Sequence, residues 1–104
     1  MKIIVNGEEF NVDIANTFFK RLFGLMGKKN IQRGLLFKTK GIHTFFMREN
    51  IDIVMLDKEY KVVYYKKSLK KNRIIIKKKA YYTIELPLGS LKNISLNQKV
   101  TIEK

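Results

Sequence analysis

The 104-residue chain has no cysteine, one proline and one histidine, and these shortages limit its chemistry. Without cysteine it has neither disulfides nor thiolate ligands for a metal ion. No apolar run approaches the roughly 18 to 20 residues needed to cross a bilayer, and the run at positions 3–5 is too short for a signal-peptide core. We therefore expect no membrane span, a mature chain that begins at residue 1 and a cytoplasmic location.

Acidic residues are also scarce: nine Asp and Glu stand against 22 Lys and Arg, so the net charge is +13. Eight basic residues and no acid fall in the segment 66–79, KKSLKKNRIIIKKK, which is called the basic segment below. Such a charge favours anionic partners. The alternative is a purely compositional bias, because 18 of the 22 cations are lysine and a charge run is usually a solvated face.

Short apolar runs separated by turn residues dominate the chain. Residues 2–14 predict a β-hairpin that turns at Asn6 and Gly7, because both positions accept positive φ. Phe10, Val12 and Ile14 alternate with polar residues, which predicts one buried face. Further strands are expected at 35–37, 42–48, 51–56, 61–65, 73–76, 80–86 and 100–102. The runs 42–48 and 51–56 are apolar on both sides, which indicates strands covered on both faces.

The apolar residues between positions 18 and 26 follow helical spacing, which predicts one short α-helix near residues 17–26, ending at Gly27. Length and an apolar content of 45% predict one domain with a single core. Eight or nine short strands with one helix describe a mainly β fold, a small barrel or sandwich.

Several motifs occur in an order that is specific to one family. They are RLFGLMG at 21–27, GLLF at 34–37, HTFFMR at 43–48, IDIVMLD at 51–57 and ELPLG at 85–89. From about Phe10 to its end, the chain resembles the family catalogued as domain of unknown function 192. The resemblance implies a compact, mainly β domain with one short helix, and no established activity.

The ionisable residues inside apolar runs are the candidates for a site, since burying a polar group without a partner costs about 1–3 kcal/mol. They are Arg21 on the predicted helix and His43, Arg48, Asp52 and Glu85 on the predicted strands. The family pattern includes Arg21, Arg48, Asp52 and Glu85. We hypothesise that they form a polar cleft at one end of the barrel, where an arginine could bind a carboxylate or phosphate. The alternative is structural, with the arginines paired to the two acids.

His43 is the only group suited to acid–base chemistry near neutral pH. A lone histidine in a strand is more often a hydrogen-bonded core residue. No phosphate-binding loop, dinucleotide-binding or nucleophile-elbow motif is present. We predict no catalytic residue, metal or cofactor, and an enzyme built around His43 and Asp52 is the third-ranked hypothesis.

The favoured interpretation is a monomeric, non-enzymatic binding or accessory module for a small anionic ligand or an acidic partner. The runner-up is nonspecific nucleic-acid binding through the basic segment, since lysine gives salt-sensitive backbone contacts and nearby tyrosines could stack on bases. The residues of that alternative are Lys66, Lys67, Lys70, Lys71, Arg73, Lys77, Lys78 and Lys79.

Overall fold

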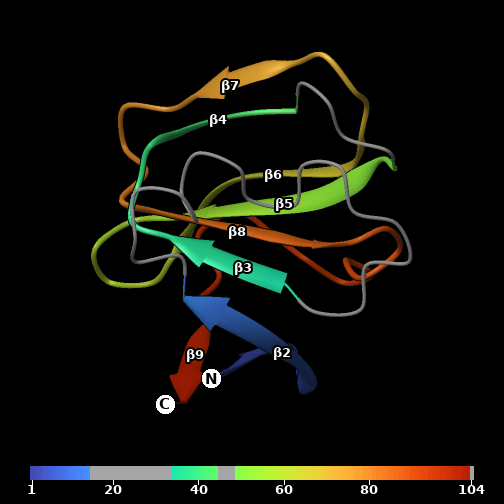
Figure 1. Cartoon of the computed structure of the whole chain (residues 1–104). Helices are drawn as coiled ribbons and strands as arrows, with labels where there is room; N and C mark the ends of the chain where they lie inside the picture. The colour runs from blue at the N-terminus through green and yellow to red at the C-terminus, as the bar shows by residue number, and fades with distance from the viewer. Residues whose placement is uncertain (15–33, 45–48, 104) are drawn as a thin grey trace.

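The computed structural model describes residues 1–14, 34–44 and 49–103, and within these ranges the chain is a β protein (Figure 1). The helix expected near 17–26 lies outside the described residues, as do Arg21 and Arg48. The nine strands in these ranges are β1 (Lys2–Val5), β2 (Glu8–Ile14), β3 (Gly34–Phe37), β4 (Gly41–His43), β5 (Ile51–Leu56), β6 (Val62–Leu69), β7 (Ile74–Ile76), β8 (Tyr82–Pro87) and β9 (Thr101–Glu103). In the same ranges no helix is long and apolar enough to span a membrane.

Seven strands form one sheet in the order β6-β5-β8-β3-β2-β1-β9, while β4 and β7 form a second, two-stranded sheet. The large sheet curls until its two edges approach each other at one end. There Lys61 and Lys99 form a β-bridge, and the Val100 N–H donates to the Tyr60 carbonyl at 2.8 Å. The expected mainly β barrel or sandwich is confirmed, in the form of a curled half-barrel.

Both faces of the large sheet are covered, which explains why β3 and β5 are buried along their whole length. The inner face carries the larger core, with Val12, Leu36, Val54, Ile84 and Leu86 among its members. The outer face carries a second cluster: Leu35, Phe37, Ile51, Ile53 and Leu69. Ile42 of β4 and Ile75 of β7 pack on that cluster, so the small sheet covers the outer face (Figure 1).

The tight turn expected at Asn6 and Gly7 is confirmed, and a second tight turn follows β5. Asn6 and Gly7 both have positive φ, 51° and 80°, and connect β1 to β2 in the predicted hairpin. After β5, the Asp57 carboxylate accepts hydrogen bonds from the N–H groups of Glu59 and Lys61, both at 2.9 Å. This side chain therefore fixes the turn into β6.

Three expectations about the strands need correction. The strand expected at 42–48 ends at His43, which is exposed rather than covered. Thr44 follows β4, and its hydroxyl donates to the Lys70 carbonyl and accepts from the Arg73 N–H, both at 2.8 Å. Conversely, β6 continues to Leu69 instead of ending at residue 65. In the hairpin, Val12 is buried as expected, but Ile14 is 41% exposed.

Candidate functional site

Asp52 and Glu85 lie on neighbouring strands but on opposite faces of the large sheet. Asp52 is opposite Leu86, and Glu85 is opposite Ile53. Residues opposite each other share a face while successive residues alternate, so Asp52 faces the inner core and Glu85 the outer cluster. These two residues of the predicted polar cleft therefore do not meet in one cleft.

The carboxylate of Asp52 has a local structural task. Its side chain is 1% exposed, and its two oxygens accept from different backbone groups, the Ser68 N–H at 2.8 Å and the Leu91 N–H at 2.9 Å. Opposite the stretch from Ile51 to Ile53 of β5, strand β6 carries one extra residue and so forms a β-bulge. Ser68 lies in that bulge and has a φ of 55°. Asp52 thus fixes the bulge and ties it to the segment after β8.

His43 is in a different layer from Asp52. It is exposed on β4, opposite Ile74 of β7, on the side of the small sheet that faces away from the outer cluster. The structure does not bring His43 and Asp52 into one site. Among the described residues, no group of three or more His, Cys, Asp or Glu side chains could hold a metal ion.

A cationic depression of about 550 Å³ lies between the β5–β6 turn and the segment that joins β7 to β8. Its lining residues are Lys40, Asp57, Lys58, Glu59, Val63, Lys78, Lys79, Ala80 and Tyr81. We call it the lysine pocket. Backbone bonds hold its walls together: the Lys77 N–H donates to the Lys40 carbonyl at 2.9 Å, and the Tyr81 N–H donates to the Leu56 carbonyl at 2.7 Å.

Positive charge and one aromatic ring define the chemistry of the lysine pocket. Its lining has four lysines against two acids, and one of these acids, Asp57, already accepts the two turn hydrogen bonds. The Lys58 ammonium lies 5.4 Å from the centre of the Tyr81 ring, and that of Lys38 lies 5.0 Å from it. These cation–π contacts hold flexible lysines near the pocket wall.

The Tyr81 ring belongs to a small tyrosine cluster. It meets Tyr82 edge-on at 4.8 Å, and Tyr82 stacks on Tyr60 at 5.1 Å between ring centres. A hydrogen bond with the Tyr60 side chain, followed by burial and the neighbouring phenols, raises the pKa of Tyr82 to about 12. Three of the five tyrosines thus form a packed unit at one side of the pocket.

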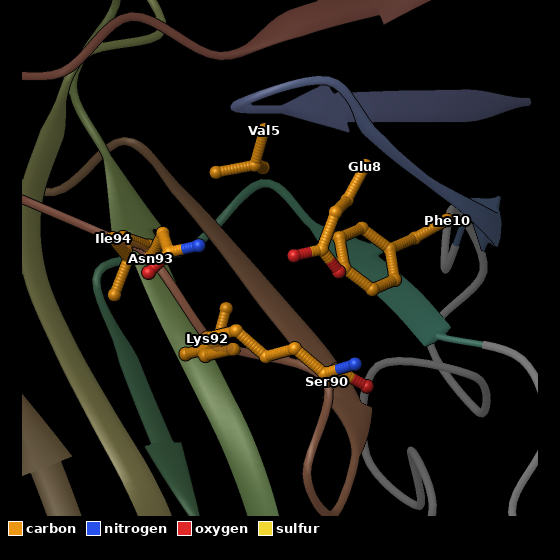
Figure 2. Close-up of a pocket in the computed structure, with 8 residues that line it drawn as sticks. Val5, Glu8, Phe10, Ser90, Lys92, Asn93 and Ile94 are labelled. Carbon is orange, nitrogen blue, oxygen red and sulfur yellow. The ribbon is translucent and has the colours of Figure 1, made fainter.

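A second cavity, lined in part by Val5, Glu8 and Phe10 from the β1–β2 hairpin and by Lys92 and Ile94, is shown in Figure 2. Its volume is about 10 Å³. A water molecule needs roughly 10–15 Å³, so this cavity holds at most one water and is no ligand site.

The cations of the basic segment have different surroundings. Lys66 and Lys67 are exposed at the end of β6, and the Lys67 ammonium donates to the Lys92 carbonyl at 3.1 Å. Lys70, Lys71 and Arg73 are exposed around the turn that Thr44 fixes. Lys77 lies 4.4 Å from the centre of the Tyr64 ring, while Lys78 and Lys79 line the lysine pocket.

The sequence did not mark Lys40 or Lys58 as possible site residues, and it indicated Lys78, Lys79 and the nearby Tyr81 only as nucleic-acid contacts. No local pattern marks these residues, because lysine is common throughout the chain. Three segments distant in sequence form the pocket, and only the pairing of β4 with β7 and the turn after β5 bring them together.

Solved structures with the same fold identify the structural class. A Sinorhizobium meliloti protein described as a candidate transcription regulator superposes with a TM-score of 0.81 at 17% identity, covering 96% of this chain and 89% of that one. A protein of unknown function from Novosphingobium aromaticivorans gives 0.74 at 14% identity, covering 97% and 82%. At these identities the likeness concerns the fold alone, that of a small curled β protein.

Sequence comparison gives the family. The chain matches the domain of unknown function 192, described as uncharacterized ACR, over residues 1–103, and it belongs to this family, as its motifs indicated. It is 43% identical over 94 residues to a UPF0127 protein of Pyrococcus horikoshii, covering 83% of this chain and 80% of that protein. A UPF0127 protein of Thermococcus kodakarensis is 36% identical over 94 residues, covering 84% of this chain but only 60% of the relative's length.

Proposed function

We propose that this protein is a non-enzymatic binding module that takes a small anionic ligand in the lysine pocket. The observation that carries the proposal is the gathering of Lys40, Lys58, Lys78 and Lys79 around a depression of about 550 Å³. Small-molecule sites in proteins typically have volumes of about 300–1,000 Å³, so the pocket has a suitable size. Expected partners are molecules that carry a phosphate or carboxylate group.

The chemistry of the lining supports binding rather than catalysis. Lysine ammonium groups act as mobile point charges that bind phosphate or carboxylate oxygens. The Ser–His and Cys–His pairs of many covalent catalysts have no counterpart in the described lining, which has no serine, cysteine or histidine. Asp57, the acid that begins the turn, is engaged by two backbone N–H groups.

Nucleic-acid binding through the basic segment has less support in the described residues. Stacking on bases requires accessible aromatic faces, whereas Tyr60 and Tyr82 stack on each other and Tyr64 packs on the outer cluster beneath Lys77. The description of the Sinorhizobium protein as a candidate transcription regulator concerns that protein. A cytoplasmic location and a monomeric state remain predictions.

The test is an NMR titration of the ¹⁵N-labelled protein with sodium pyrophosphate at low ionic strength. We expect the amide signals of Lys58, Lys79 and Tyr81 to shift in a saturable manner. Lys58→Gln should weaken binding about tenfold, because one charge-assisted contact contributes on the order of 1.5–3 kcal/mol. Lys92→Gln is the matched control, since it removes the same charge from an exposed residue outside the pocket.

Equal weakening by Lys58→Gln and Lys92→Gln would show that only the overall charge matters, and it would refute the pocket. The pocket is also refuted if pyrophosphate shifts no amide signals around it at any accessible concentration. A parallel titration with a single-stranded oligonucleotide tests the alternative, which predicts shifts along the whole basic segment and a steep loss of affinity with salt.

A further inference from the structure

In the described part of the chain, β7 has a neighbouring strand on one side only, which is β4. Interstrand hydrogen bonds connect Lys77 to Lys40 and Arg73 to Thr44, each at 2.9 Å. Because bonded and non-bonded pairs alternate in an antiparallel ladder, the pair between these two, Ile42 with Ile75, is the next bonded one. The N–H and C=O groups of Ile74 and Ile76 therefore point away from β4, toward the free edge.

The side chains on the same stretch are apolar and exposed. Ile74 is 62% exposed and Ile76 is 64% exposed, whereas Ile75 between them packs on the outer cluster. Across the ladder, Ile74 is opposite the exposed His43, and Ile76 is opposite Gly41, which has no side chain to cover it. Figure 1 shows β7 at the outer margin of the molecule, at the top of the view. Among the described residues, the strand thus combines an unpaired backbone edge with exposed apolar side chains.

Basic residues lie on both sides of this edge. Lys70, Lys71 and Arg73 precede β7 and Lys77 follows it, and all four are exposed. The turn before β7 is held in place by the two hydrogen bonds of the Thr44 hydroxyl, so the strand is presented by a fixed support. Lysines at a strand edge can serve simply to prevent aggregation, but two exposed isoleucines on the same strand work against that purpose.

We propose that β7 binds an extended, acidic polypeptide segment of another protein by strand addition. The segment would pair with the backbone of Ile74 and Ile76, cover their side chains with its own apolar residues, and place its carboxylates beside the flanking cations. A second copy of this chain fits poorly, because pairing β7 with β7 would bring together two basic segments of eight positive charges each. The proposal goes beyond the small-anion function, since none of β7 lines the lysine pocket.

The binding experiment uses a fluorescein-labelled synthetic peptide of alternating valine and glutamate, about nine residues long, with fluorescence anisotropy as the readout. A peptide with lysine in place of glutamate is the charge control. We expect the acidic peptide alone to bind, and more weakly as salt is added. Hydrogen exchange then distinguishes strand addition from simple ionic contact, because only strand addition slows the exchange of the Ile74 and Ile76 amides.

Two variants test the geometry. Ile76→Pro removes an outward N–H and leaves the bonds to β4 in place, so the variant should fold and bind the peptide about tenfold more weakly. If Ile76→Pro fails to fold, the double variant Ile74→Ser and Ile76→Ser keeps the backbone and removes the apolar contacts, with the same expected loss. Lys92→Gln, outside β7, should bind normally.

The proposal is overturned if the acidic peptide does not bind, or if it binds without protecting the Ile74 and Ile76 amides. A second outcome also overturns it. In that outcome a single-stranded oligonucleotide displaces the acidic peptide from the β7 edge, and both variants bind the oligonucleotide with the same affinity as the wild-type protein.

Discussion

At the residue scale, several short polar side chains in this protein position the backbone. Asp52 holds a bulge, Asp57 fixes a turn and Thr44 anchors the start of β7. In each case a side-chain oxygen accepts from a backbone N–H, and the Leu91 N–H that Asp52 binds is buried, where such a group must be bonded. The sequence marked Asp52 as unusual because of its apolar neighbours, but only the structure shows that its oxygens are already engaged.

Asp52→Asn should destabilise the protein by about 2–3 kcal/mol. An amide has one acceptor oxygen and would present its NH₂ group to either the Ser68 or the Leu91 N–H, leaving a buried donor without a bond. Urea denaturation followed by circular dichroism measures the loss. As a control, Ser68→Gly keeps the backbone donor and relieves a positive φ, so we expect a stability gain of up to roughly 1 kcal/mol. A neutral Asp52→Asn would contradict the structural role.

Tyr82 should make stability fall in alkaline solution. Its pKa is raised to about 12, whereas a tyrosine in the unfolded chain ionises near pH 10. Below about pH 10 Tyr82 is protonated in both the folded and the unfolded state, and its full contribution to stability is retained. Between about pH 10 and 12 the unfolded state loses protons first, so the folded state is progressively disfavoured.

The measurement for Tyr82 is a tyrosinate absorbance titration of the folded protein. Tyr60→Phe removes the largest cause of the shift and should lower the high-pH transition toward 10. Tyr65→Phe lies outside the stacked pair and should leave that transition in place. Identical titration curves for the two variants would refute the role of the Tyr60 hydrogen bond.

At the scale of elements, the sequence predicted the strands better than the faces they present. The turn at Asn6 and Gly7 and the buried run 51–56 have strong local signals, and both appear where expected. The face of the large sheet on which Asp52 or Glu85 lies depends on the register of β5 with β8. A shift of one residue in either strand would move its side chain to the opposite face. Register is set by long-range pairing and bulges, so no local pattern could place these two acids on opposite sides.

Gly34 illustrates how closely β2, β3 and β8 approach each other. A Cβ atom at this position would lie 2.7 Å from the Glu85 carbonyl oxygen and 2.9 Å from a methyl group of Val12. Gly34→Ala should therefore cost about 1–3 kcal/mol through overpacking. Gly7 has space around it and a φ of 80°, so Gly7→Asn, which tolerates that φ, should be nearly neutral. Thermal denaturation of both variants checks the contrast, and equal stability would contradict the tight approach.

At the scale of the whole molecule, the candidate site depends on contacts between distant segments. The lysine pocket and the β7 edge both exist because the small sheet is fixed over the outer face by Ile42 and Ile75. The pairing of β4 with β7 joins residues more than thirty positions apart, for example His43 with Ile74. Composition could predict a basic surface, but it could not divide that surface into a pocket and a strand edge.

The junction between the two edges of the large sheet should behave as part of one cooperative unit. Val100 is 1% exposed there, and its N–H bonds to Tyr60 while the Val62 N–H bonds to the Gln98 carbonyl, both at 2.8 Å. If the curl is integral to the core, these amides should exchange hydrogen only by global unfolding, with the same free energy as amides of β5 and β8. Val100→Ala removes roughly two buried methyl groups and should lower all of these free energies together, by about 1–3 kcal/mol. Faster exchange confined to Val62 and Val100, with β5 unaffected, would mean that the edges separate independently and that the half-barrel is held by its inner core alone.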